Sequence, residues 1–275
     1  MRVQDIIPIW RLERLRARWK ANRNLHARPI DIDQPTSYDD LLREITILPE
    51  DWHGAGVCGL TPLRAIAFYA QNRKIVHSAE TGVGKSTLLL SHISQHHTAF
   101  ALDDTGTSNS LINVRDSTLL RRDCVNFIIG PTQQTLPRYS FTNRLQMVLI
   151  DGPHGFPFPE IEYYFFYPQL DEDGLLIIDD IHIPTVFRLF SFLREEKMFD
   201  FLGVASTTAF FRRNSSAPFD PLGDGWWMQN YNRKRFPISD FDQDFLSANA
   251  PTSVEFRNLM LHAIHQLQDR ASKAK

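Results

Sequence analysis

Three carboxylates follow two apolar segments that have the length and composition of buried strands. Asp151 comes directly after Met147–Ile150, and Asp179 and Asp180 come directly after Leu175–Ile178. If these segments are neighbouring parallel strands, their carboxyl ends meet at one edge of the sheet, where such sheets bind ligands. Like charges so close need protons or a cation to neutralise them, and carboxylate oxygens with waters suit Mg²⁺, Mn²⁺ or Ca²⁺. We therefore expect a metal site of Asp151, Asp179 and Asp180. The alternative is that Asp151 and Asp180 only cap the turn and the helix that follow them.

A glycine loop follows the apolar segment Ile75–Ala79, with the sequence Glu80-Thr-Gly82-Val-Gly84-Lys85-Ser86. Glycines let the backbone turn tightly and approach a ligand, and the helix that begins here offers free N–H groups. One interpretation is a P-loop NTPase or kinase that uses Lys85, Ser86 and, for magnesium, Asp151. Two residues count against it, because Ala79 stands where that motif has its first glycine and Glu80 adds negative charge.

The interpretation that we favour is the nucleoside-binding loop of a doubly wound sheet. Its fingerprint would be Glu80, Gly82 and Gly84, and the acidic residue suits a ligand that presents an amino group. A second acidic residue should end the next strand and accept hydrogen bonds from ribose hydroxyls. Asp103, with Asp104 as the adjacent alternative, stands there, about 20 residues past the loop.

Short apolar segments alternate with helix-length stretches from about residue 74 onward, which predicts a parallel sheet covered on both faces. The segments are Ile75–Ala79, Ala99–Leu102, Val125–Ile129, Met147–Ile150 and Leu175–Ile178. Phe201–Ala205 and Ala209–Arg212 follow a predicted helix and are close enough in sequence to pair antiparallel. The predicted fold class is α/β, a doubly wound, Rossmann-like, seven-stranded and mostly parallel sheet with an antiparallel last strand.

This core spans residues 74–213, between an N-terminal helical extension (1–73) and an aromatic loop with a C-terminal helix (214–275). Further helices are expected over residues 5–25, from a Ser37 cap to Ile45, from Thr61 to Asn72, over Val186–Leu193 and over residues 253–271.

From about Lys74 to Arg213 the chain resembles class I S-adenosylmethionine-dependent methyltransferases, and among them bacterial small-molecule enzymes similar to metal-dependent O-methyltransferases. The likeness rests on the glycine loop, Asp103, Gly130-Pro-Thr132, Asp151-Gly-Pro-His154 and Gly174-Leu-Leu-Ile-Ile-Asp179-Asp180. The resemblance implies that Glu80 holds the methionine amino group of the cofactor and that Gly82, Gly84 and Ser86 form the loop along it. It also implies that Asp103 or Asp104 binds the ribose, while Gly130 and Thr132 flank the adenine and Asp151 borders the cofactor.

The acidic residues are similar to those of catechol O-methyltransferase and of metal-dependent sugar O-methyltransferases. In the catechol enzyme the base lies three positions after the first metal-binding Asp, and the same count reaches His154. A neutral imidazole is a competent base near pH 7, and a cation would lower the pKa of the acceptor hydroxyl. The resemblance therefore implies O-methylation of a small molecule with His154 and Asp151 catalytic, assisted by Mg²⁺ or another divalent cation. His182 is a second candidate for ligand or base, and a catalytically inactive methyltransferase-like binding subunit is the remaining alternative.

Composition limits the class of protein. The 275 residues are 43% hydrophobic and 23% charged, with 30 basic and 32 acidic side chains, as in ordinary soluble domains. No apolar run approaches the ~18–20 residues that span a bilayer, and two cysteines are too few for a disulfide framework. We expect a cytoplasmic protein with a small-molecule substrate, no nucleic acid and no membrane span, and we leave a homo-oligomer open. The basic residues concentrated in the first 28 positions are interpreted as a solvated helix whose apolar side packs on the body or on another subunit. The alternative is a contact with anionic lipid or nucleic acid.

Two other groups of residues carry weaker signals. His92, His96 and His97 have no acidic partner at a fitting spacing, so we interpret them as a solvated helix end rather than a metal site. Trp226 and Trp227 lie in an irregular stretch and indicate either a substrate wall or a packing flap.

Overall fold

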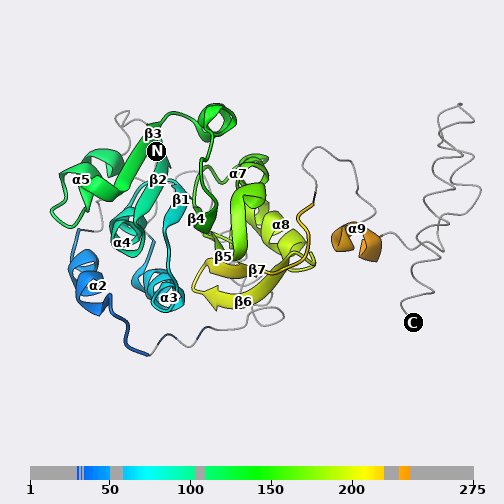
Figure 1. Cartoon of the computed structure of the whole chain (residues 1–275), viewed down its shortest axis with the longest axis horizontal. Coiled ribbons are helices and arrows are strands. Elements are labelled where there is room, and N and C mark those ends of the chain that lie inside the picture. The colour runs from blue at the N-terminus through cyan, green and yellow to red at the C-terminus, as the bar shows by residue number, and fades with distance from the viewer. Residues whose placement is uncertain are drawn as a thin grey trace, which may run out of the picture. The chain divides into compact units, whose positions relative to one another are not determined.

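The computed structural model describes residues 30, 32, 34–49, 58–102, 109–219 and 229–235 (Figure 1). The chain divides into two compact units, residues 1–194 with 199–216, and residues 195–198 with 217–275. In the second unit the described helix is α9 (Asn230–Arg235), and the Tyr231 N–H donates to Glu196 Oε1 at 2.9 Å. The elements below belong to the first unit. The helices predicted over 5–25 and 253–271 lie outside the described residues, as do Asp103, Asp104, Trp226 and Trp227.

Seven strands of the described residues form one sheet, in the order β3-β2-β1-β4-β5-β7-β6. Neighbouring strands are parallel except at β7, which runs antiparallel to both β5 and β6. The strands are β1 (His77–Thr81), β2 (His96–Ala101), β3 (Val125–Ile129), β4 (Leu145–Ile150), β5 (Leu170–Ile178), β6 (Phe199–Ala205) and β7 (Thr208–Arg213). This topology confirms the predicted fold class, including the antiparallel last strand.

Helices cover both faces of the sheet (Figure 1). Phe210 and Phe211 are successive residues of β7, so their side chains point to opposite faces. Phe210 contacts Tyr69 of α3, with ring centroids 5.4 Å apart, whereas Phe211 contacts Phe190 of α8 at 6.0 Å. The helices are α2 (Asp39–Thr46), α3 (Leu60–Ala70), α4 (Lys85–Ile93), α5 (Ser110–Asp116), α6 (Thr132–Thr135), α7 (Phe158–Phe166) and α8 (Pro184–Leu193), with short 3₁₀ turns at Arg122–Cys124, Leu136–Arg138 and Tyr167–Gln169.

The central strands are buried, and this holds even for β1, whose residues His77-Ser-Ala-Glu-Thr81 are mostly polar. Four of the five residues of β1 and five of the six residues of β4 are buried. The first strand begins two residues later than predicted. The reason is that Gln146 Oε1 accepts hydrogen bonds from the backbone N–H groups of Val76 (3.1 Å) and His77 (2.8 Å), in place of a backbone partner.

The N-terminal helices α2 and α3 share the hydrophobic core of the sheet through Leu42, Ile45, Leu63 and Ile66, which are at most 2% exposed. The prediction that Ser37 caps α2 is wrong. The helix begins at Asp39, so its N-cap residue is Tyr38, and the Tyr38 side chain makes no capping hydrogen bond. Thr36 makes the hydrogen bonds at this end of the helix. Its hydroxyl donates to Asp39 Oδ1 at 2.8 Å and accepts from the Tyr38 N–H at 3.2 Å.

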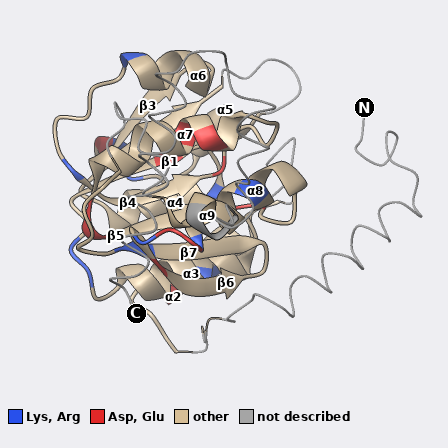
Figure 2. Cartoon of the chain, turned by 90° about the vertical axis from the view of Figure 1, so that its right-hand side faces the viewer, with Lys and Arg blue, Asp and Glu red and all other residues tan. Residues whose placement is uncertain are grey.

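None of the described helices combines the length and the apolar character that a membrane span requires. Basic and acidic residues are interspersed over the described elements (Figure 2).

Candidate active site

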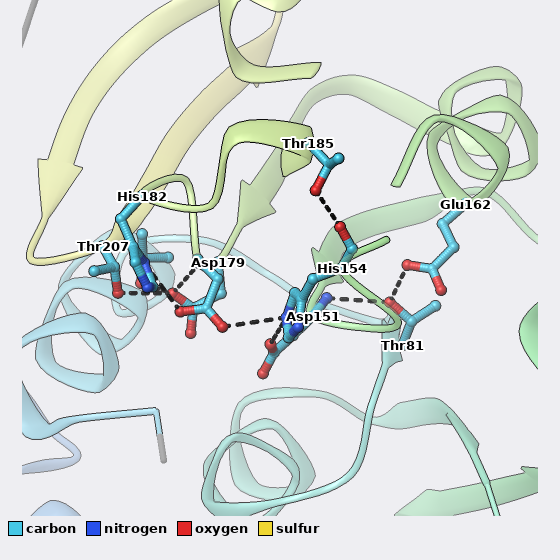
Figure 3. Close-up of polar contacts among 10 residues, drawn as sticks. Thr81, Asp151, His154, Glu162, Asp179, His182, Thr185 and Thr207 are labelled. Carbon is cyan, nitrogen blue, oxygen red and sulfur yellow. Dashed lines mark hydrogen bonds and ion pairs between the residues drawn. The ribbon is translucent and has the colours of Figure 1, made fainter. Parts of the chain in front are cut away.

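The carboxyl ends of β4 and β5 meet as the sequence predicts, because the two strands pair in parallel with Ile150 opposite Ile178. The Asp179 N–H donates to the Ile150 carbonyl at 3.0 Å, which joins the two strand ends directly. Asp151 and Asp180 follow these strand ends, and His154, in the turn after β4, lies close to both carboxyl groups; Figure 3 shows His154 beside Asp151. The spacing of the acidic residues along the chain is therefore realised as one cluster.

Asp151, His154 and Asp180 form the centre of this cluster. His154 Nε2 lies 3.2 Å from Asp180 Oδ2 and 3.6 Å from Asp151 Oδ1. His182 Nδ1 lies 3.4 Å from the other Asp180 oxygen, on the outer side. One ligand atom each of Asp151, His154 and Asp180 lies within 4.8 Å of the others, a spacing that a single cation can bridge.

The cluster holds protons more tightly than separate carboxyl groups would. Burial raises the pKa of Asp151 to about 8. The charges of Asp179 and Asp180 also raise this pKa, whereas the neighbouring imidazole of His154 lowers it. Burial, followed by the charge of Asp179, likewise raises the pKa of Asp180. The neighbouring carboxyl group of Asp151, followed by the charge of Asp180, raises the pKa of His154, so this imidazole is more basic than a free one.

Asp179 is 6% exposed and is not among the residues whose ligand atoms lie within 4.8 Å of one another. Its Oδ1 accepts hydrogen bonds from the Thr208 hydroxyl at 2.6 Å, the Asp180 N–H at 2.7 Å and the Thr207 hydroxyl at 3.3 Å (Figure 3). These bonds tie the end of β5 to the start of β7 and hold Asp180 at a φ of 54°, in the left-handed region. The set of residues that the structure gathers thus differs from the predicted metal ligands by having His154 in place of Asp179.

The glycine loop runs directly against this cluster. Gly82 has a φ of 84°, and a Cβ added to it would lie 3.3 Å from the carbonyl carbon of Asp151 and nearer still to its oxygen. The Gly82 N–H donates to the Phe100 carbonyl at 2.9 Å, which fixes the loop to β2. Only a residue without a side chain allows β1 and the turn after β4 to approach so closely.

Glu80 lies beneath the loop and is fully buried. Its carboxylate accepts from the Ser86 hydroxyl at 2.9 Å, from the Thr87 hydroxyl, and from His97 Nε2 at 3.1 Å. The Thr87 hydroxyl in turn accepts from the Gly84 N–H at 2.9 Å, which closes the first turn of α4. A carboxylate has about four acceptor sites, so these three hydrogen bonds do not use up its capacity.

Comparison with known proteins agrees with this architecture. Residues 79–181, from Glu80's strand to the residue after Asp180, match a family described as a methyltransferase domain. The matched residues include the glycine loop and the ends of β4 and β5, the part of the chain on which the sequence resemblance rests. A search of curated proteins finds no match.

Several solved structures are similar to this chain over about three quarters of its length. They include the O-methyltransferase TomG from Streptomyces achromogenes in complex with S-adenosylmethionine (SAM), at 13% identity and a TM-score of 0.47 over 74% of this chain and 98% of that one. An O-methyltransferase from Bacillus cereus in complex with S-adenosylhomocysteine (SAH) has 12% identity and a TM-score of 0.45, over 77% of this chain and 95% of its own. A SAH-bound methyltransferase from Podospora anserina has 15% identity and a TM-score of 0.47, over 76% and 97%.

Lys85, which supported the P-loop interpretation, is directed away from the glycine loop. The side chain is 6% exposed, and its Nζ donates to the carbonyl of Leu48 at 2.9 Å, just past the end of α2. A cation near the last carbonyls of a helix is favourable there. Lys85 therefore ties the N-terminal helices to α4.

The predicted adenine side lies at the ends of β2 and β3. Gly130 has a φ of 135° and donates its N–H to the Ala101 carbonyl at 2.8 Å, and Thr132 is the buried first residue of α6. Gly130 and Thr132 thus follow the carboxyl end of β3, and their contact with an adenine stays a prediction.

Two buried groups were missed or misread from the sequence. The interpretation of the histidines as a solvated helix end is wrong for His97, which lies on β2, is 1% exposed and contacts both Glu80 and Ser78. Glu162 of α7 is fully buried, and burial raises its pKa to about 7 against the hydrogen bond from Thr81. An acidic residue inside the aromatic stretch Phe156–Tyr167 was the available signal for Glu162.

Proposed function

We propose that this chain transfers the methyl group of SAM to a hydroxyl group of a small-molecule acceptor. The observation that carries the proposal is the approach of the Gly82 loop to the Asp151–His154–Asp180 cluster at one edge of the sheet. In a doubly wound sheet the loop after the first strand binds the nucleoside ligand. A sulfonium methyl group presented from this loop would face groups that can accept a proton.

The cluster suits a hydroxyl acceptor better than an amine. A neutral amine already has a nucleophilic lone pair, whereas a hydroxyl reacts well only as its proton is removed. His154 is the group for that step, because two carboxylates raise its basicity and would stabilise the imidazolium that forms. The in-line displacement itself needs mainly positioning of the acceptor oxygen opposite the sulfonium.

A divalent cation is the second candidate for activating the acceptor. Two carboxylates and one imidazole within 4.8 Å offer the oxygen and nitrogen atoms that Mn²⁺ and similar ions accept, so Asp151, His154 and Asp180 would hold it, with Asp179 as the predicted further ligand. When bound, the cation would lower the pKa of an acceptor hydroxyl. His154 cannot be both a ligand and the base, so the two arrangements exclude each other.

Calorimetric titration of the full chain with SAM and with ATP, each with and without Mg²⁺, tests the proposal. We expect SAM to bind with micromolar affinity and ATP not to bind. Binding of ATP alone would restore the P-loop interpretation. Binding of neither ligand would indicate a catalytically inactive, methyltransferase-like binding subunit.

Methyl transfer to the acceptor is followed with [methyl-³H]SAM and fractionated small-molecule extracts. The substitution His154→Gln should lower turnover by about 10²–10⁴ while SAM affinity stays unchanged. Loss of activity in EDTA and its recovery with Mn²⁺ would assign His154 to a cation, whereas activity that survives EDTA would assign it as the base.

A further inference from the structure

Glu162 connects the aromatic helix α7 to the active-site turn through one hydroxyl group. The Thr81 hydroxyl donates to Glu162 Oε2 at 2.7 Å and accepts from the Asp151 N–H at 3.1 Å (Figure 3). A hydroxyl has a single proton, so donation to the carboxylate leaves its lone pairs for the Asp151 N–H. Glu162 thus orients Thr81, and Thr81 fixes the first residue of the turn.

The same carboxylate packs against the backbone of Gly152. A Cβ added to Gly152 would lie 2.6 Å from Glu162 Oε2 and 2.7 Å from its Cδ, distances that real side chains do not show, and nearer still to Oε1. By contrast, a Cβ added to Gly155 in the same turn would meet only the Phe158 ring, at 3.8 Å. The close contact is therefore specific to the position that follows Asp151.

The far end of the turn is held by a different helix. The Thr185 hydroxyl of α8 donates to the backbone carbonyl of His154 (Figure 3). Residues 151–154 are thus fixed at both ends, by α7 through Thr81 and by α8 through Thr185. The support through Thr81 contains a buried ionisable group, Glu162, whereas the support through Thr185 does not. Burying such a group costs free energy, so a residue that only filled space would more simply be apolar.

We propose that Glu162 is a positioning residue for methyl transfer, which acts through Thr81 and against Gly152 to hold the turn that presents Asp151 and His154. The role of Glu162 in methyl transfer rests on the proposed function, whereas its contacts with Thr81 and Gly152 are independent of that function. Methyl transfer depends steeply on geometry, because misplacement by about 1 Å can cost about 10²-fold in rate. An isosteric amide at position 162 can still accept from Thr81, so Glu162→Gln is the conservative variant.

Amide hydrogen exchange of the full chain, followed by NMR, reads out the support directly. We expect Glu162→Ala and Thr81→Val to speed exchange of the Asp151 amide at least tenfold relative to the amides of β4. Glu162→Gln should stay within threefold of the wild type. Phe166→Leu, which alters a fully buried residue one turn further along α7, serves as the control and should leave the ratio unchanged. An Asp151 amide that exchanges equally in all variants would overturn the proposal.

A double-mutant cycle tests the packing contact. Gly152→Ala should weaken SAH binding at least tenfold in the wild type but by less than threefold in Glu162→Ala, where the added methyl group has room. Gly155→Ala should have little effect in either background. Equal effects of Gly152→Ala in both backgrounds would contradict the contact. If the wild type binds no SAH, the proposed function fails, and the exchange experiment still decides the role of Glu162.

Discussion

Replacing Gly82 by Ala should damage the cofactor site more than the rest of the fold. The residue has a φ of 84°, and a left-handed backbone costs a residue with a Cβ about 1–2 kcal/mol. The added atom also overlaps the backbone carbonyl of Asp151, and overpacking of this kind costs about 1–3 kcal/mol. The total is about 2–5 kcal/mol, and because the opposing atoms belong to the backbone, no side-chain rotation relieves it.

This energy appears either as lost stability or as a displaced loop. Since 1.4 kcal/mol is a factor of about ten, a displaced loop should weaken SAM binding at least about tenfold. If the loop stays in place, the melting temperature should fall by at least about 4 °C. Calorimetry with SAM and thermal unfolding monitored by circular dichroism measure the two outcomes. Gly155→Ala is the matched control, because its Cβ would make only ordinary contacts. A Gly82→Ala variant that binds SAM within twofold of the wild type and melts at the same temperature would refute the reasoning.

Three further predictions concern buried polar groups. The raised pKa of Glu162, about 7 against an ordinary 4.5, means that the folded state binds its proton more tightly, so the free energy of unfolding should fall by up to about 3 kcal/mol as the pH rises from 4.5 to 7. Denaturant unfolding at both pH values should show a smaller fall in Glu162→Gln, and equal falls would contradict the pKa. Thr208→Val removes a 2.6 Å hydrogen bond to buried Asp179 and should lower the free energy of unfolding by about 1.5–3 kcal/mol. Thr207→Val removes a 3.3 Å hydrogen bond to the same carboxylate and should lower it by less than about 1 kcal/mol. Urea unfolding of both variants measures the difference. Lys85→Met should leave SAM affinity within about threefold in the same calorimetric assay, because Lys85 faces the Leu48 carbonyl; a loss beyond tenfold would place Lys85 at the ligand.

The sequence predicts those parts of the site that depend on strand ends. Parallel strands that are neighbours bring their carboxyl ends together, so the adjacency of Asp151 and Asp180 follows once the apolar segments are recognised. The glycine loop is predicted for a similar reason, because the close approach of Gly82 to Asp151 leaves no room for a side chain.

The spacing of residues along the chain does not determine which partners their side chains contact. Asp179 Oδ1 accepts hydrogen bonds from Thr208, the first residue of the antiparallel strand β7, and from Thr207 just before it, which lie 29 and 28 residues later in the sequence. His97 and Glu162 are buried by pairings with residues 17 and 81 positions away. The sequence shows their residue types but contains no local pattern that connects such partners.

The most direct test of the central claim is a crystal structure of the full chain with SAH. The account predicts that the methionine part of the ligand lies along residues 82–84 and that its sulfur faces the cluster of Asp151, His154 and Asp180. Ligand bound elsewhere, for example in the groove of about 620 Å³ between α2 and α3 that Arg43 and Arg64 line, would contradict it.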